Sequence, residues 1–185
     1  ASVETDARGF VRVDPHLRTS APHIFAAGDV TGRLLLVPPA IQDGFVAATN
    51  AVRGATMTLG EAVNPIGSFT DPEYAQVGLT EAQAIERIGA EHVTTKLQSY
   101  GDTAYGWAMA DESGVCKVIA DRRDGTILGA HILGYQASNL IQPIIGAMSF
   151  GIDAFTFARG QYWVHPALME VVENALLGLD VPQGE

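Results

Sequence analysis

A histidine and a glutamate near the C-terminus have the residue types and the spacing that acid–base chemistry requires. His165 precedes Pro166 just ahead of an expected helix, and Glu170 follows five residues later. The carboxylate could accept a hydrogen bond from the imidazole and orient it. Such a pair could take a proton from an attacking thiol and return it to a leaving thiol. On spacing alone, a histidine that caps the helix beside a solvated glutamate is the favoured alternative.

A second candidate site combines a carboxylate with a helix N-terminus. Gly28 and Asp29 follow the apolar run of residues 23–27, so a buried strand would deliver the carboxylate at its C-terminal end, where open α/β sheets bind ligands. Apolar residues at helical spacing predict a helix from Pro38 to about Arg53, whose free N–H groups would attract an electron-rich atom. Because Gly-Asp pairs are common in turns, a plain turn remains the alternative for this segment.

The elements that must position these residues follow from hydrophobic periodicity, which divides the chain into two parts. The first part adds a strand at residues 10–13 to the strand and helix above. The second part, about residues 66–179, mixes an antiparallel sheet with flanking helices, which is an α+β arrangement. Its expected strands are residues 66–69, a second strand after the Asp71-Pro72 turn, and residues 93–98, 115–121 and 126–133, the last two joined by an Asp124-Gly125 hairpin. Its expected helices are residues 81–88, 138–150, 154–159 and 166–177, with Thr80 and Asp153 as caps.

The composition is that of a soluble globular protein. The 185 residues are 47% hydrophobic and 17% charged, and 11 Lys plus Arg against 21 Asp plus Glu give a net charge of −10. This acidic balance argues against nucleic acid or an anionic membrane as the main partner, because both attract clustered basic residues. Residues 125–152 lack charged side chains, but glycines and amides interrupt them, so no membrane-spanning helix is expected. Residues 1–10 are polar, and no secretory signal is expected.

The single cysteine limits the redox and metal chemistry of these residues. Cys116 is alone, which excludes an internal disulfide, a Cys-rich zinc site and a Cys-x-x-Cys redox pair, and no metal site is expected. Cys116 is predicted to be a buried small residue, and His131 a hydrogen-bonded histidine of the sheet, rather than a nucleophile and a ligand. A reducing cytoplasm is the expected location.

Three segments together resemble the pyridine nucleotide-disulfide oxidoreductases. Residues 17–32, LRTSAPHIFAAGDVTG, are similar to the second FAD-binding segment of that family. Residues 69–81, FTDPEYAQVGLTE, are similar to the opening of its C-terminal dimerisation domain. Residues 161–170, QYWVHPALME, contain the His-Pro-x-x-x-Glu element found near the family's C-terminus.

The resemblance assigns roles to individual residues. It implies that Gly28 and Asp29 belong to a cofactor site in which Asp29 binds a ribityl hydroxyl of FAD. It also implies that the turn containing Val37, Pro38 and Ala40 aims backbone N–H groups at the N1/C2 carbonyl region of the flavin. A helix N-terminus there would stabilise negative charge on a reduced flavin.

The same resemblance implies an active site that two subunits share. His165, with Glu170 as its partner, would act on the redox disulfide of the other subunit, so that a homodimer completes the site. The apolar segment of residues 140–150 is expected to need the cover that a symmetric interface provides. Several family members have a further histidine where this chain has Trp163.

The resemblance also implies a domain organisation and a function. Residues 1–60 would be the C-terminal part of an α/β FAD-binding domain, and residues 61–185 the dimerisation domain. The chain would be the C-terminal portion of a flavin-dependent NAD(P)H:disulfide oxidoreductase of redox homeostasis, acting on a low-molecular-weight or protein disulfide. The Gly-rich FAD turn, the Cys-x4-Cys disulfide and the NAD(P)H domain do not occur in these residues, so the chain alone is expected to be inactive. The alternative is a non-catalytic dimerisation module without cofactor or activity.

Within the family, different segments point to different members. Residues 100–109, 131–138 and 160–179 look most like mycothione reductases, and residues 36–50 look closer to mercuric reductase-like members. Residues 181–185 lack the paired cysteines that mercuric reductases use, which disfavours mercury chemistry.

Overall fold

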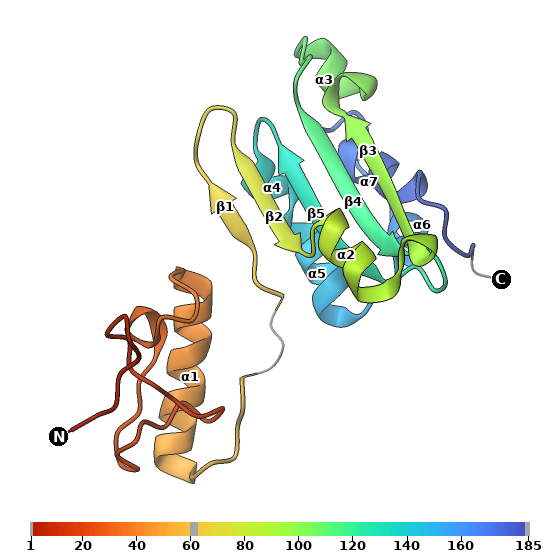
Figure 1. The fold of residues 1–185 in the computed structure, drawn as a ribbon. Coiled ribbons are helices and arrows are strands. Elements are labelled where there is room, and N and C mark those ends of the chain that lie inside the picture. The colour runs from red at the N-terminus through yellow and green to blue at the C-terminus, as the bar shows by residue number, and fades with distance from the viewer. Residues whose placement is uncertain (1, 60–62, 184–185) are drawn as a thin grey trace. The chain divides into compact units, whose positions relative to one another are not determined.

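The computed structural model describes residues 2–59 and 63–183, and it divides into two compact units (Figure 1). The units are Ala1–Asn64 and Pro65–Glu185. The domain boundary expected between residues 60 and 61 lies outside the described residues. No helix in the described part of the chain is long and apolar enough to cross a membrane.

The first unit is built around one long helix. Helix α1 (Val37–Arg53) has prolines in its first turn, as predicted, because a missing N–H costs nothing there. A short 3₁₀-helix, η1 (Gly28–Thr31), precedes it. A small core forms where Leu17, Val46 and Ala47 pack together, with partly buried apolar side chains around them.

The strands predicted at residues 10–13 and 23–27 are not present in this unit. Each segment makes a single bridge, Thr5 with Val11 and Arg18 with Phe25. Aspartate side chains turn the backbone close to both bridges: Asp6 accepts hydrogen bonds from the N–H groups of residues 8 and 10, and Asp14 from those of residues 16 and 18. A periodic segment becomes a strand only when a neighbour pairs with it over several residues, and among the described residues no strand pairs with either segment in that way.

The second unit is an antiparallel five-stranded sheet with the order β1-β2-β5-β4-β3. The α+β prediction for this part is therefore confirmed. Its strands are β1 (Ile66–Ser68), β2 (Tyr74–Gly78), β3 (Val93–Ser99), β4 (Val115–Asp121) and β5 (Ile127–Leu133). Its α-helices are α2 (Glu81–Ile88), α3 (Ala104–Ala108), α4 (Ala137–Leu140), α5 (Gln142–Phe150), α6 (Ala154–Arg159) and α7 (Glu170–Leu177), and its 3₁₀-helices are η2 (Ala90–His92) and η3 (Tyr100–Asp102).

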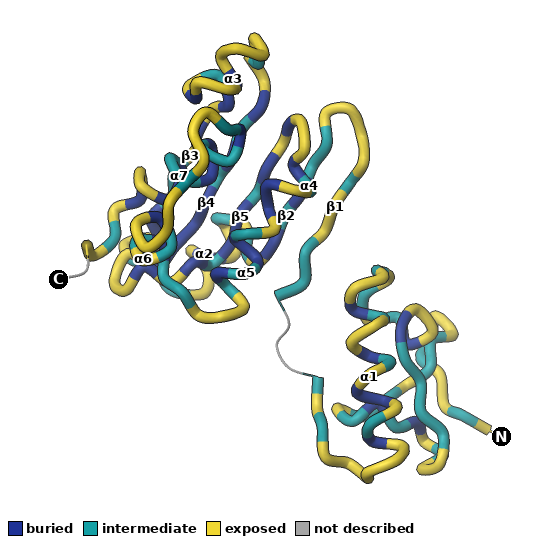
Figure 2. Tube along the Cα trace, turned by 180° about the vertical axis from the view of Figure 1, so that it is seen from behind, coloured by how far each residue is buried: buried dark blue, intermediate teal, exposed yellow. Residues whose placement is uncertain are grey.

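Helices cover both faces of this sheet. Helices α4, α5 and α7 pack on one face, where Val118 and Ile132 are fully buried, and α2 lies against the other face (Figure 1). Ala84 of α2 and Ile119 of β4 form the core on that second face. Figure 2 shows the buried residues concentrated along β4 and β5, whereas the tip around α3 is exposed.

Two predicted helices have different bounds in the structure. The segment of residues 138–150 is split at Ile141 into α4 and α5, because Pro143 has no N–H with which to continue the hydrogen bonds of α4. The last helix starts at Glu170 and not at Pro166. The N–H of Ala167 donates to the Glu170 side chain, so these residues form a turn.

The apolar segment expected to need a partner is already covered within the unit. Leu140, Ile144 and Ile145 are buried, and of the large apolar side chains in α5 only Phe150 is strongly exposed. The expectation that this segment needs a symmetric interface to cover it is therefore wrong, except at Phe150. The other strongly exposed apolar side chains of this unit lie outside this segment, at Phe69, Trp107, Tyr162 and Val164.

The backbones of β2 and β5 approach each other unusually closely at Gly78 and Gly129, a place called the β2–β5 crossing below. Gly78 is paired with Gly129, and the Leu79 N–H donates to the Leu128 carbonyl at 2.9 Å. A Cβ atom on Gly129 would stand 2.1 Å from the Leu79 oxygen, and one on Gly78 would stand 2.3 Å from the Leu128 oxygen. Only glycine fits on either side of this crossing, which leads the chain from β2 into the capped start of α2.

Candidate active site

His165 and Glu170 form a hydrogen-bonded pair. The imidazole Nδ1 lies 2.7 Å from Glu170 Oε1, and Oε2 accepts a hydrogen bond from the Ala167 N–H at 3.0 Å. The His165 side chain is 70% exposed, whereas the Glu170 side chain is 16% exposed. The carboxylate is therefore anchored in the fold, and it holds an imidazole that solvent can reach.

The charge of Glu170 determines which imidazole nitrogen can take a proton. Desolvation raises the Glu170 pKa, but hydrogen bonds from His165 and the Ala167 N–H, with the charge of His165, outweigh it and hold the pKa below its usual value of 4.5. An ionised carboxylate can only accept, so Nδ1 carries the hydrogen of this contact. In the neutral imidazole Nε2 then has the free lone pair, and none of residues 2–59 and 63–183 hydrogen-bonds to it.

The loop between α6 and α7 positions the pair. The indole N–H of Trp163 donates to the Ala158 carbonyl at 2.8 Å, and its ring meets Phe157 edge-on with centroids 5.8 Å apart. On the other side of His165, Leu168 is buried. Trp163 thus serves as an anchor for this loop.

A second glutamate on the same helix has the opposite pKa shift. Burial, together with the negative charge of Glu170, raises the pKa of Glu173 above 4.5, and Arg159 only partly offsets this. A lowered pKa makes Glu170 contribute stability above pH 4.5, and this contribution is lost as pH falls through its folded pKa. A raised pKa gives Glu173 a contribution that is present below pH 4.5 and lost as pH rises through its folded pKa.

The two glutamates therefore predict opposite responses to pH. We expect Glu170→Gln to lower the free energy of unfolding by about 1–2 kcal/mol at pH 7, because charge-assisted hydrogen bonds are lost, and to change it little at pH 3. The matched variant Glu173→Gln should raise stability at pH 7 relative to pH 3. Urea unfolding of both variants at the two pH values measures this. A Glu170→Gln penalty that is equal at both pH values would contradict the assignment.

Part of the predicted cofactor site comes together in the first unit. Gly28 is buried with φ +72°, and a Cβ atom on it would stand 3.1 Å from the Ala40 Cβ, so the turn packs closely against the start of α1. The next residue, Asp29, is exposed. Its carboxylate has no hydrogen-bond partner in the described part of the chain, so it is free to accept from a ligand hydroxyl. An exposed acceptor of this kind fits a polyhydroxyl group, as FAD would present.

The start of α1 offers fewer N–H groups than the resemblance implies. Pro38 and Pro39 have none, and the Ala40 N–H donates to the Leu36 carbonyl at 3.1 Å. In this described turn, the N–H of Val37 is the one that makes no hydrogen bond within the helix. The two prolines in the sequence already indicated that few N–H groups would be free here. Val37 is therefore the backbone donor that remains for a ligand at this helix end.

Sequence reasoning missed a carboxylate beneath this turn. Asp43 of α1 is buried, and it accepts hydrogen bonds from the Gly28 N–H and from the Arg33 side chain. Its place in the helix could have indicated this burial, because Asp43 lies on the same face of α1 as Val46, Ala47 and Asn50, which are also buried.

His131 and Cys116 have the structural roles that the sequence predicted, a hydrogen-bonded histidine of the sheet and a buried small residue. His131 Nδ1 lies 3.0 Å from the Tyr74 hydroxyl, and its Nε2 lies 3.1 Å from the Leu79 carbonyl oxygen. Cys116 is fully buried, and this burial raises the pKa of its thiol to about 12. Within residues 2–59 and 63–183, no three His, Cys, Asp or Glu side chains are grouped as a metal site.

The antiparallel sheet with its flanking helices and the turn before it each match a known family model. The model described as "Pyridine nucleotide-disulphide oxidoreductase, dimerisation domain" matches residues 64–176. The model described as "Pyridine nucleotide-disulphide oxidoreductase" matches residues 1–44. The chain belongs to the pyridine nucleotide-disulphide oxidoreductase family, as its three sequence segments predicted.

Among curated members of this family, the chain is similar to proteins of more than one activity. Mycothione reductase of Mycobacterium tuberculosis is 53% identical over 176 residues, which cover 92% of this chain and 38% of that protein. Dihydrolipoyl dehydrogenase of Corynebacterium glutamicum is 34% identical over 180 residues, which cover 96% of this chain and 38% of that protein. The chain thus spans 38% of the length of these relatives.

Solved structures share the fold. LpdA from Mycobacterium tuberculosis matches with a TM-score of 0.83 and 26% identity, over 95% of this chain and 38% of that one. The HOCl-induced flavoprotein disulfide reductase RclA from Escherichia coli, as its Cu(II) complex, matches with a TM-score of 0.84 and 25% identity, over 95% of this chain and 39% of that one.

Proposed function

We propose that this chain is the C-terminal part of a flavin-dependent NAD(P)H:disulfide oxidoreductase, to which it supplies a dimer surface and an acid–base pair. The observation that carries the proposal is the 2.7 Å contact between His165 Nδ1 and Glu170 Oε1. It leaves Nε2 exposed as a proton acceptor, which is what thiol–disulfide exchange requires. The mycothione reductase similarity over 92% of the chain supports a low-molecular-weight disulfide as substrate.

The proton chemistry follows from the pair. An incoming thiol gives its proton to Nε2 of His165 and attacks one disulfide sulfur as a thiolate. A new S–S bond forms as the old one breaks, and the leaving thiolate takes the proton back from Nε2. Glu170 keeps Nδ1 protonated throughout and stabilises the imidazolium that forms in between.

The disulfide in this scheme must come from outside residues 1–185. Cys116 is the only cysteine, it has no resolving thiol, and it is buried beneath the sheet helices. A cysteine pair of the partner subunit fits this need, because exposed apolar side chains precede His165. Tyr162 is fully exposed and Val164 is 74% exposed, so burying them in a homodimer interface would bring His165 to the partner.

The first unit would contribute to the flavin site. Asp29 would accept hydrogen bonds from ribityl hydroxyls, Gly28 would let the turn approach Ala40, and the Val37 N–H would donate to the flavin. Bound FAD would supply the electron transfer between NAD(P)H and the disulfide.

A subunit-mixing experiment tests this function. In a reductase that carries residues 1–185, His165→Gln subunits are mixed with subunits whose redox cysteines are changed to serine. Each variant alone should be inactive toward a low-molecular-weight disulfide, and the mixture should recover about a quarter of the wild-type activity, because half of randomly formed dimers hold one complete site. Absence of recovery would contradict a shared site. A wild-type protein with neither flavin absorbance nor turnover would instead support the non-catalytic dimerisation module.

A further inference from the structure

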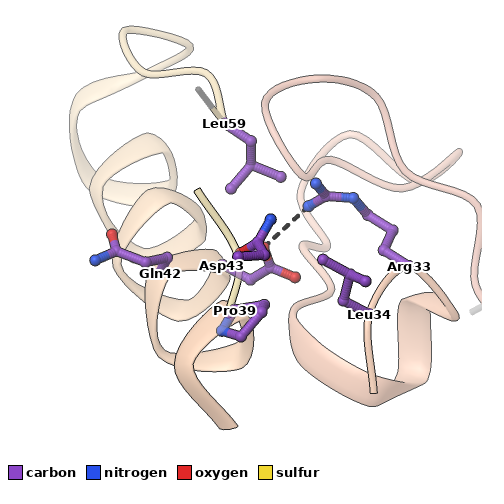
Figure 3. A pocket seen from close by; sticks show the side chains of 7 residues that line it. Arg33, Leu34, Pro39, Gln42, Asp43 and Leu59 are labelled. Carbon is purple, nitrogen blue, oxygen red and sulfur yellow. Dashed lines mark hydrogen bonds and ion pairs between the residues drawn. The ribbon is translucent and has the colours of Figure 1, made fainter. Parts of the chain in front are cut away.

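One buried carboxylate connects helix α1 to the turn that carries Asp29. Asp43 is 4% exposed, and its two oxygens have different partners. Oδ2 accepts a hydrogen bond from the Gly28 N–H at 3.2 Å, and Oδ1 accepts one from Arg33 Nη1 at 2.9 Å. Figure 3 shows Arg33 reaching from the loop toward Asp43 on the helix. One side chain therefore holds both ends of the loop between residues 28 and 33.

The loop between these two attachment points is closed by its own hydrogen bonds. The Thr31 hydroxyl donates to the Gly28 carbonyl at 2.7 Å, and the Gly32 N–H donates to the Asp29 carbonyl at 3.0 Å. Asp29 lies inside this small closed segment, and its own carboxylate makes no hydrogen bond or ion pair with the described part of the chain. Its position is thus determined by the loop, and the loop is held by Asp43.

The surroundings of Asp43 argue against its binding a ligand directly. The adjoining cavity has a volume of about 30 Å³ and is lined by Arg33, Leu34, Pro39, Gln42 and Leu59 (Figure 3). A water molecule fills such a space, whereas a flavin or a sugar does not. A buried carboxylate is retained only where partners compensate its charge, and here both partners belong to the loop.

We propose that Asp43 is a positioning residue for the flavin site, and that it acts by fixing the Gly28–Arg33 loop in the conformation that presents Asp29. The proposal rests on the proposed function, in which Asp29 binds a ribityl hydroxyl. Asp43 itself touches neither cofactor nor substrate. Its contribution is to remove the freedom of the loop before the cofactor arrives.

The first test measures FAD binding to the apo form of a reductase that carries residues 1–185. Asp43→Asn keeps the side-chain volume but removes the charge and turns one acceptor oxygen into an NH2 group, so one of the two donors loses its acceptor. We expect the FAD dissociation constant, measured by flavin fluorescence, to rise about tenfold or more. The matched control is Asp121→Asn, which alters another buried aspartate paired with an arginine, in the other unit. An unchanged dissociation constant in Asp43→Asn, or an equal rise in Asp121→Asn, would overturn the proposal.

A double-mutant cycle with Asp29→Asn separates this proposal from the proposed function. If Asp43 acts through Asp29, Asp43→Asn should weaken FAD binding much less in the Asp29→Asn background than in the wild type. Additive effects would overturn the positioning role. If Asp29→Asn alone leaves FAD binding unchanged, the cofactor assignment of Asp29 itself fails, which is a different outcome.

A third measurement needs no flavin and uses the 185-residue chain. Hydrogen exchange at the Gly28 N–H should be faster in Asp43→Asn than in the wild type, because that group has lost its carboxylate acceptor. If Asp43→Asn does not fold, Arg33→Lys keeps the positive charge but not the guanidinium geometry, and should raise the FAD dissociation constant by a smaller factor. Unchanged exchange in a folded Asp43→Asn chain, or unchanged FAD binding in Arg33→Lys, would contradict the proposed clamp.

Discussion

In a reductase that carries residues 1–185, and on the proposed function, replacing His165 by glutamine is expected to lower kcat for disulfide reduction by about 10²–10⁴-fold, the usual contribution of a general acid–base group. Glutamine retains a side-chain hydrogen bond to Glu170 but cannot take a proton from a thiol. The loss should fall on the step between the enzyme's dithiol and the substrate disulfide. Reduction of the flavin by NAD(P)H should continue at the wild-type rate, because that step needs no proton from His165. Stopped-flow absorbance distinguishes the two half-reactions.

The control for this variant is a histidine outside the proposed site. The side chain of His92 in η2 is 37% exposed beside Glu91, and His92→Gln should have nearly wild-type kcat. If His165→Gln slows both half-reactions equally, the residue has a structural role and not an acid–base role. If it slows neither, the proposed chemistry of the His165–Glu170 pair is wrong.

Gly129→Val is expected to destabilise the second unit by about 3 kcal/mol or more, which is the upper range for an overpacked site. The first atom of the new side chain would stand 2.1 Å from the Leu79 carbonyl oxygen, so the β2–β5 crossing would have to open. Opening it stretches the hydrogen bond from the Leu79 N–H to Leu128 and displaces the start of α2. Both tryptophans of the chain, Trp107 and Trp163, belong to this unit, so their fluorescence reports its unfolding in urea.

A glycine in open space provides the control for this substitution. Gly146 lies in α5, and a Cβ atom added to it would meet no atom within 4 Å outside its own helix backbone. Gly146→Ala should therefore stabilise the unit by about 0.5–1 kcal/mol, since alanine loses less entropy in a helix. A Gly129→Val protein that unfolds at the wild-type urea midpoint would contradict this prediction, because it would show that the β2–β5 crossing can open without loss of stability.

Sequence patterns predicted the parts of the fold that depend on neighbours in the chain. The Thr80–Gln83 capping box is present, with both of its hydrogen bonds, and Asp153 caps α6 through the Thr156 N–H. The hairpin at Asp124-Gly125 joins β4 to β5, with Gly125 at φ +76°. Each of these signals is completed within four residues, so no knowledge of the rest of the fold was needed.

Patterns failed where the outcome depends on distant partners. Residues 10–13 and 23–27 alternate or cluster as strands do, but no continuous strand pairs with either of them among the described residues. The contact of Asp43 with Gly28 spans fifteen residues and joins a helix to a loop, so spacing could not reveal it. The His165–Glu170 contact was open to two interpretations, because residues five apart do not face each other on a continuous helix. It forms because α7 begins only at Glu170.

The burial of Cys116 has a practical consequence for labelling experiments. Maleimides and related reagents react with thiolates, and a fully buried thiol with a pKa raised to about 12 presents almost none at neutral pH. The folded 185-residue chain is therefore expected to react very little with such reagents. A cysteine placed at an exposed position such as Val52 would carry the sole fluorophore or spin probe, without any need to remove the natural thiol first.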